Sequence, residues 1–463
     1  MLDKKEIAMT TISDGISRQC ARFIQNLSFG NLDQETLSIV KKCIIDWMGC
    51  AIGGSSTSAA QIVESLVMDM GGKPQATLLG NFNKTTILQA AMVNAYNSHI
   101  LEMDDVHKSS ISHPAAPVIS TTFALAEHLG SSGKEMVEAI VAGYEVMIRI
   151  GEAISPSHYT LWHTTSTCGT FGAAAASAKL LHLDEQSVLH SLGNAGSQAA
   201  GLWEFASDNA MTKYLHCGKA AYNGLVSSLL AQKGFTGASQ ILEGPRGFFK
   251  AYSQETNFER SFKDWGIHYK IRETAFKPYA SCRHTHGPIN AVLNLCQRED
   301  ITYENVESIT VETYDVALPL VDNYDFSTPA AAKFCLPYCL ASALILGQVG
   351  VDAFREEYLT DPRFKKLAFS VTLKSSEELN ALYPLKWASR VVIQTNQGNS
   401  YDIFIDYPKG DPENTMSDTE IEEKYFSLTA LRMERSKADS LLQQIKSIEN
   451  RDSLINIFQK FFL

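Results

Sequence analysis

Four short segments of the sequence combine imidazole, ammonium, thiol and carboxylate side chains, which are the groups that move protons or hold anions. The segment from His99 to His113 contains three acids and three histidines in fifteen residues. Its candidates for chemistry are Asp104, Asp105, His107 and His113. These residue types are compatible with a metal site, with an acid–base loop that anchors a substrate, or with a solvated loop whose carboxylate caps a helix. Because Lys108 stands where a DDxxD motif needs an acid, and no second acidic motif follows, we expect no metal.

The second and third segments each place a histidine beside a possible anion-binding element. Trp162–Gly172 contains His163 and a run of hydroxyl and glycine residues that enters a helix of small residues. No strand precedes it and GxGxxG is absent, which argues against a dinucleotide site, whereas the free N–H groups of a helix N-terminus suit a carboxylate. In Met211–Lys219, Lys213 and His216 are three residues apart and share one face if the segment is helical.

The fourth segment, Phe276–Pro288, holds Lys277, Cys282, Arg283 and His286 within a short stretch. Its His-Thr-His sequence is typical of some metal hydrolases, but there the motif lies on an early barrel strand, and here the preceding residues have a helical pattern. Further along, Tyr338 lies in the apolar stretch Phe334–Ala341, which predicts a buried helix. Its phenol is expected either in the core or facing a cleft.

The hydrophobic pattern indicates which elements position these segments. The first 260 or so residues have helical spacing, and residues 136–150 and 172–181 are apolar nearly all round, as in helices buried inside a bundle. Alternation over 307–318 and in two runs within 390–407 predicts strands, the latter two forming a hairpin. Residues 333–346 and 352–359 read as helices, and helical spacing returns at 441–448 and 454–462. We therefore expect a mostly α fold: a helical domain formed by residues 1–268 and 413–463, and an inserted α+β lid at 269–412.

Composition limits the classes of function. The chain has 463 residues, 45% of them hydrophobic, and a net charge of −11, which argues against a nucleic-acid or anionic-membrane surface. Nine scattered cysteines without a CxxC pair favour a reducing compartment. Residues 1–11 are charged and lack the apolar core of a secretory signal, and no apolar stretch reaches the roughly 18 residues of a membrane span. We expect a soluble cytoplasmic protein.

Taken together, the segments resemble the MmgE/PrpD family, which includes 2-methylcitrate dehydratase, cis-aconitate decarboxylase and iminodisuccinate epimerase. The resemblance extends over nearly the whole chain. It rests on five motifs in the family's order: Met103-Asp-Asp-Val-His with Ser-His113-Pro, His163 before Cys-Gly-Thr-Phe-Gly, Met-Thr-Lys213-Tyr-Leu-His, Lys277-Pro-Tyr-Ala-Ser-Cys282, and Leu-Pro-Tyr338-Cys. The chain departs from the decarboxylase pattern, which has a histidine at Cys282 and an aspartate and a threonine at Glu102 and Val106.

The resemblance implies a homodimeric enzyme of large helical domain and smaller lid, working on a small polycarboxylate without metal or organic cofactor. It also implies which side chains line the cleft. The expected catalytic residues are His113, His163, Lys213, Lys277, Cys282 and Tyr338. The expected substrate-binding residues are Asp104, Asp105, His107, His216, Arg283 and His286.

Such residues can stabilise the enediolate that forms when a proton next to a carboxylate is removed, with lysines near its oxygens and histidines as base and acid. The leading hypothesis is a 2-methylcitrate-type dehydratase. The same side chains could serve a cis-aconitate decarboxylase or an iminodisuccinate-type epimerase, because those reactions pass through related carbanions. A non-catalytic carboxylate-binding protein is the remaining alternative.

Overall fold

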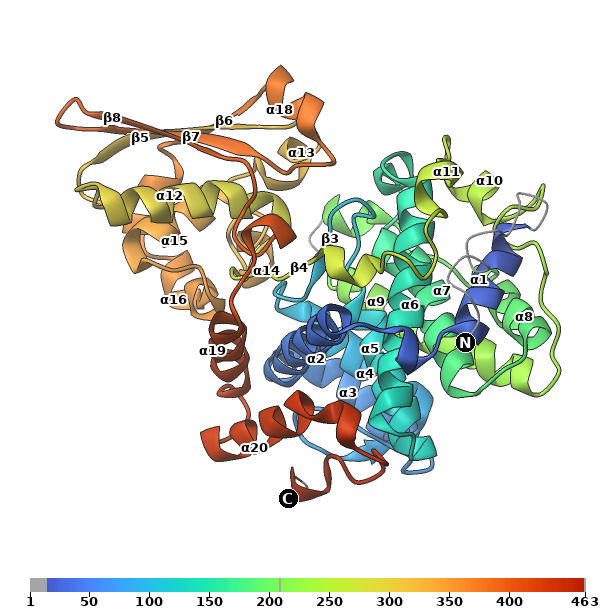
Figure 1. Cartoon of the computed structure of the whole chain (residues 1–463). Helices are drawn as coiled ribbons and strands as arrows, with labels where there is room; N and C mark the ends of the chain where they lie inside the picture. The colour runs from blue at the N-terminus through green and yellow to red at the C-terminus, as the bar shows by residue number, and fades with distance from the viewer. Residues whose placement is uncertain (1–14, 208–209, 462–463) are drawn as a thin grey trace.

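The computed structural model describes residues 15–207 and 210–461, which form a helical part and a smaller part built around a sheet (Figure 1). Residues 1–11, which are not expected to form a secretory signal, lie outside the described residues. Among the residues described, no helix has the length and apolarity needed to cross a membrane. A mostly helical fold with a small α+β part was expected from the sequence, and that expectation is confirmed.

The helical part is a bundle in which α7 lies at the centre, in contact with α5, α6 and α9. Small residues allow this packing: a Cβ added at Gly172 would lie 2.8 Å from the Cβ of Met147 and 3.0 Å from the carbonyl oxygen of Gly143. The helices are α1 (Ile16–Asn26), α2 (Gln34–Gly54), α3 (Ser58–Met70), α4 (Ile87–Ile100), α5 (Ala115–Leu129), α6 (Gly133–Ile154), α7 (Thr164–Leu180), α8 (Glu185–Gly196), α9 (Thr212–Gln232), α10 (Phe248–Tyr252) and α11 (Phe258–Ser261).

The lid contains a four-stranded sheet in the order β6-β5-β7-β8. Strand β5 (Val306–Thr313) runs parallel to β6 (Val371–Ser375) and antiparallel to β7 (Ser389–Thr395), which forms the expected hairpin with β8 (Ser400–Ile405). One face of the sheet is covered by helices (Figure 1), as the alternating burial along β7 requires. The lid helices are α12 (His286–Arg298), α13 (Leu318–Val321), α14 (Pro329–Ala332), α15 (Leu336–Leu346), α16 (Glu356–Leu359), α17 (Pro362–Ala368) and α18 (Glu377–Leu382).

Two connections join the lid to the helical part. Strand β3 (Val106–His107) pairs antiparallel with β4 (Thr274–Ala275), immediately before the lid begins. After β8 the chain returns to the bundle, where α19 (Asp418–Thr429) and α20 (Arg435–Lys446) contact α2 (Figure 1). The parts of the chain that carry the polar segments are therefore brought together where the lid meets the bundle.

Some expected elements differ in detail. Residues 352–359 form a 3₁₀ turn and the one-turn helix α16, separated at Arg355, instead of one helix. Of the stretch 454–462 with helical spacing, the described residues 454–461 form turns and the 3₁₀ helix Gln459–Phe461, and Phe458 packs into the bundle core. The first 260 residues also include two small strands, β1 (Ala76–Thr77) and β2 (Lys84–Thr85), and a turn-rich stretch at 233–247.

Candidate active site

A cavity with about 430 Å³ of empty space, including space open to solvent, lies where the loop after α4, the start of α7, helix α9 and the lid meet. Its wall combines cations and imidazoles with aromatic side chains, so the polar groups face a small and largely enclosed space. The lining residues are Glu102, Val106, Ile111, His113, Tyr159, His163, Trp203, Lys213, Lys277, Cys282, Arg283, His284, Leu320, Phe334 and Trp387.

The strongest charges in this wall are two lysines that share one carboxylate. The Nζ of Lys213, on α9, lies 2.5 Å from Oε1 of Glu102, and the Nζ of Lys277 lies 3.4 Å from Oε2. All three side chains are buried. Burial favours the neutral form of Glu102, but the nearby ammonium groups outweigh it and hold its pKa well below the usual range. The cavity therefore presents two ammonium groups against one carboxylate.

The backbone at Glu102 is held in an unusual conformation by lysines from the lid side. Its φ of +58° lies in the left-handed region, which costs a residue other than glycine free energy. Lys277 donates to the Glu102 carbonyl at 3.0 Å, and Lys333 donates to the carbonyls of Leu101 at 3.0 Å and Ile100 at 3.4 Å. These contacts lie at the end of α4, where unpaired carbonyls favour a cation.

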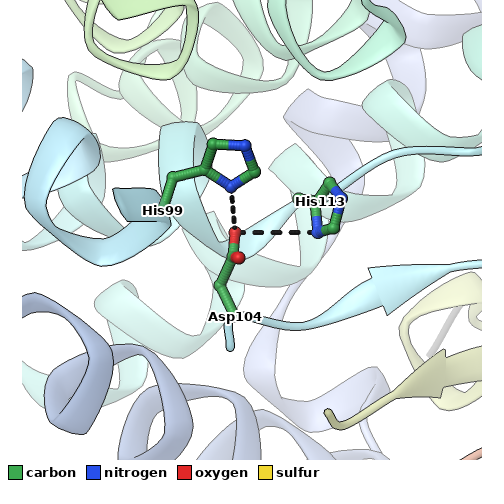
Figure 2. Close-up of side chains that lie close together, drawn as sticks. All are labelled: His99, Asp104 and His113. Carbon is green, nitrogen blue, oxygen red and sulfur yellow. Dashed lines mark hydrogen bonds and ion pairs between the residues drawn. The ribbon is translucent and has the colours of Figure 1, made fainter. Parts of the chain in front are cut away.

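A carboxylate flanked by two imidazoles lies beside the cavity (Figure 2). The Oδ2 of Asp104 is 2.7 Å from Nδ1 of His99 and 3.7 Å from Nδ1 of His113. Nδ1 of His113 is also 2.6 Å from the carbonyl oxygen of Asp105, so it carries a proton and leaves Nε2 as the free base. Burial and the lysines Lys277 and Lys213 lower the pKa of His113 to about 3, although Asp104 acts in the opposite direction.

The same three side chains could also hold a metal ion. One ligand atom from each of His99, Asp104 and His113 lies within 4.8 Å of the others. Asp104 is hydrogen-bonded to His99. Burial alone would raise the pKa of Asp104, but the two imidazoles outweigh this effect and lower the pKa to about 2. A second such group, of His107, Glu152 and Glu273, already holds the ammonium of Lys270, at 3.1 Å from each carboxylate.

The cavity wall at the start of α7 is His163, which occupies the N-cap position of that helix. Its Nδ1 is 3.2 Å from Nδ1 of His216, on α9. Burial, followed by the neighbouring His216 and Lys213, lowers the pKa of His163 well below its usual value. His163 is therefore neutral near pH 7 and can accept a proton from a substrate.

The lid contributes thiol, guanidinium and imidazole groups. Burial raises the pKa of the Cys282 thiol, so it is protonated near neutrality. Arg283 is paired with the carboxylate of Asp411, and its Nη1 also lies 2.9 Å from Nδ1 of His286. His284 stacks on Trp387, with ring centroids 4.5 Å apart and an angle of 7° between the planes.

Several residues expected in the cleft have other partners. Asp105 accepts hydrogen bonds from the Tyr144 hydroxyl at 2.7 Å and from the Ala115 amide at 3.0 Å, and so caps α5. His107 contacts Ser110 at 3.0 Å and Glu273 at 3.3 Å. His286 contacts the Ser281 carbonyl at 3.2 Å in addition to Arg283. None of these three is among the described residues that line the cavity.

Tyr338 is the expected catalytic residue whose surroundings suit catalysis least. It follows Pro337 in the first turn of α15 and is fully buried in the lid, beside the rings of Phe354 and Phe364. Its hydroxyl donates to the Ala353 carbonyl at 2.7 Å. The cavity lining does not include it. The apolar stretch around it thus forms core, which is one of the two places that the sequence left open.

The sequence analysis did not single out Lys333 or the aromatic wall of Trp203, Phe334 and Trp387. A lysine four residues before Pro337, at the edge of an apolar stretch, was a detectable signal for Lys333. The tryptophans carried none, because aromatic residues in loops most often serve packing. Glu102 was visible only as a departure from a family pattern.

The chain matches the MmgE/PrpD N-terminal domain over residues 18–261 and the MmgE/PrpD C-terminal domain over residues 279–450. A cis-aconitate decarboxylase of Aspergillus terreus is 27% identical over 94% of this chain and 94% of the relative. The human cis-aconitate decarboxylase is 24% identical over 94% and 92%, respectively. A 2-methylcitrate dehydratase of Salmonella typhi is 20% identical over 80% of each chain. The two domain matches cover most of the sequence, and the chain belongs to the MmgE/PrpD family.

Proposed function

We propose that this protein is a cofactor-independent lyase that acts on a small di- or tricarboxylate through a carboxylate-stabilised carbanion. The observation that carries the proposal is the convergence of Lys213, Lys277, His113 and His163 on one cavity of about 430 Å³. Two ammonium groups offer contacts for carboxylates, and two imidazoles offer sites for a proton. The names of the family's relatives, all lyases on small carboxylates, agree with it.

The chemistry begins with the removal of a proton from the carbon next to a carboxylate. A neutral imidazole takes that proton, and the electron pair left on carbon delocalises into the carboxylate as an enediolate. Lys213 and Lys277 stabilise the added charge on the oxygens more than they stabilise the ground state. Loss of hydroxide, which leaves as water after a proton donor protonates it, completes a dehydration.

The first candidate reaction is dehydration of a 2-methylcitrate-type acid, because the buried imidazoles of His113 and His163 are unprotonated near pH 7 and each has a nitrogen free to take a substrate proton. The second is decarboxylation of cis-aconitate. It is favoured by relatives of that name, which are more similar to this chain than the named dehydratases. Decarboxylation releases CO₂ and leaves a carbanion that one proton quenches. An epimerase would return the proton to the opposite face.

Product analysis tests the proposal and separates the reactions. The purified, EDTA-treated protein is incubated with 2-methylcitrate, citrate, cis-aconitate and iminodisuccinate, and the products are followed by NMR. We expect an unsaturated product without CO₂ for dehydration, and CO₂ release for decarboxylation. Turnover of none of the four would contradict the proposal. Binding of citrate by calorimetry without any product would support the non-catalytic alternative instead.

Replacement of His163 tests its role in proton transfer. His163→Ala is expected to lower kcat/KM by about a hundredfold or more, which is the scale of one acid–base group. Steady-state kinetics on the best substrate provide the measurement, and circular dichroism checks folding. A folded variant with near-wild-type kinetics would remove His163 from the mechanism. The homodimer expected from the family is a separate prediction, which light scattering on the purified protein tests.

A further inference from the structure

The imidazole behind the cavity, His216, lies between two hollows of the molecule. On one side its Nδ1 is 3.2 Å from Nδ1 of His163, which lines the cavity. On the other side it lines a groove of about 1190 Å³ on the surface of the helical part. The groove is open to solvent, since Leu202 and Lys219 in its wall are exposed. It also includes the polar side chains of Gln198, Thr212 and Asn223.

Two imidazoles that meet through like nitrogens at this distance share one hydrogen between them. One Nδ1 carries the proton and donates it, and the other presents its lone pair. Burial lowers the pKa of His216 to about 4 and that of His163 further below its usual value, so both rings are neutral near pH 7, as this hydrogen bond requires. Each ring keeps its Nε2 for a second partner, and the cavity is lined by His163 and the groove by His216.

We propose that His163 and His216 form a proton relay that connects the cavity with water in the groove. His163 accepts the substrate proton on Nε2 and passes the proton on its Nδ1 to Nδ1 of His216. His216 in turn releases the proton on its Nε2 to water. Each ring carries the extra proton only in passing, the two rings end in exchanged tautomers, and the cavity has lost one proton to water. The reverse sequence restores the tautomers and delivers a proton to the cavity.

The inference rests on the proposed function, because each candidate reaction requires protons to move into or out of the cavity. Dehydration leaves one proton on the base and takes one from the acid, so both groups must be reset after each turnover. Decarboxylation consumes one proton from solvent for each CO₂ released. The aromatic and aliphatic side chains of Trp203, Phe334 and Leu320 line the cavity beside its polar groups. His216 acts through His163 and needs no contact with the substrate.

Variants at His216 distinguish a relay from a structural role. His216→Gln retains an amide that can hydrogen-bond His163 but cannot pass a proton on, whereas His216→Ala leaves space for a base from solution. The matched control is His158→Gln, because His158 is an equally buried histidine, bonded to Tyr252 and Thr167, that lines neither hollow. Activity is measured on the fastest wild-type substrate, in weak buffer and with added imidazoles of different pKa.

We expect kcat of His216→Gln and His216→Ala to fall by about a hundredfold, the lower end of the range for one acid–base group, with the control within twofold of wild type. Added imidazole should raise kcat of His216→Ala in proportion to its concentration, with a slope that depends on the pKa of the base. A structural role produces no such dependence. If the Ala variant does not fold, the Gln variant in weak and strong buffer makes the same comparison.

Two results would overturn the relay while leaving the proposed function intact. One is a folded His216→Gln enzyme with kcat within twofold of wild type in weak buffer. The other is a loss of activity in both variants that neither imidazole nor buffer concentration changes. A wild-type protein that turns over none of the carboxylates would overturn the proposed function, and the relay with it.

Discussion

Two ion clusters join the lid to the helical part, one fully buried and one that includes the exposed Glu413, and they differ in how their charges balance. The cavity cluster consists of Lys213, Lys277 and Glu102, two cations that share one carboxylate. The hinge cluster consists of Lys108, Arg283, Asp411 and Glu413. Lys108 contacts Asp411 at 3.0 Å and Glu413 at 2.9 Å, and Arg283 is paired with Asp411.

The difference indicates what each cluster is for. Burying an ion is costly unless a partner compensates its charge, so a balanced cluster is complete without a ligand. The hinge cluster has two acids for two cations and holds chain segments some three hundred residues apart in the sequence. The cavity cluster has one acid for two cations, and its three side chains line the cavity. We infer that the hinge cluster stabilises the domain arrangement and that the cavity cluster binds the substrate.

The largest expected effect comes from breaking the hinge cluster. Asp411→Asn leaves Lys108 and Arg283 buried without their shared carboxylate, and the free energy of unfolding should fall by about 3–5 kcal/mol. The measurement is urea denaturation. The control is Asp402→Asn, which removes an exposed pair with Arg390 on the same lid and should cost less than about 1 kcal/mol. Equal effects for the two variants would contradict the distinction between buried and exposed pairs.

A smaller effect, and on activity rather than stability, is expected in the cavity cluster. Lys213→Met removes one ammonium from the substrate while Glu102 keeps Lys277 as its partner. We expect kcat/KM to fall about a hundredfold, or about 2.7 kcal/mol, with the variant still folded. Lys219→Met, an exposed lysine on the same helix α9, is the control and should behave as wild type. A Lys213 variant with unchanged kcat/KM would show that the excess charge has no catalytic use.

The main features of the fold could be predicted because they depend on local patterns. The apolar run 136–150 lies within α6, and the two alternating runs form β7 and β8. Where prediction failed, local pattern and tertiary packing disagreed. The spacing at 454–462 is helical, but the described residues 454–461 form turns and a 3₁₀ helix, from which Leu454 and Phe458 pack into the bundle core while Ile455 is exposed.

The candidate site was predictable in its residue types but only partly in its geometry. Lys213, Lys277, His113 and His163 line one cavity, as expected from residues far apart in the sequence. Sequence spacing does not reveal which way a polar side chain points. Asp105 and Tyr338 each form a buried hydrogen bond outside the cavity, with Tyr144 and the Ala353 carbonyl respectively. Buried polar groups must find partners, and those partners are fixed by the assembled fold.

Mild acid sharpens the comparison, because it should spare the cavity cluster and act on buried neutral histidines. Glu102 has a pKa well below its usual range, so the cavity cluster stays charged between pH 7.5 and 5.5. Burial lowers the pKa of His158 to about 4, against a small opposing effect of its bond to Tyr252. In the unfolded chain a histidine has a pKa near 6.5, so the unfolded chain binds more protons than the folded protein as the pH falls through 6.5. The free energy of unfolding therefore decreases as the pH falls. Between these pH values, His158→Gln should lose about 1 kcal/mol less unfolding free energy than wild type, measured by urea denaturation at both. Equal losses would mean that His158 is protonated as easily in the folded protein as in the unfolded chain, and that burial does not govern its charge.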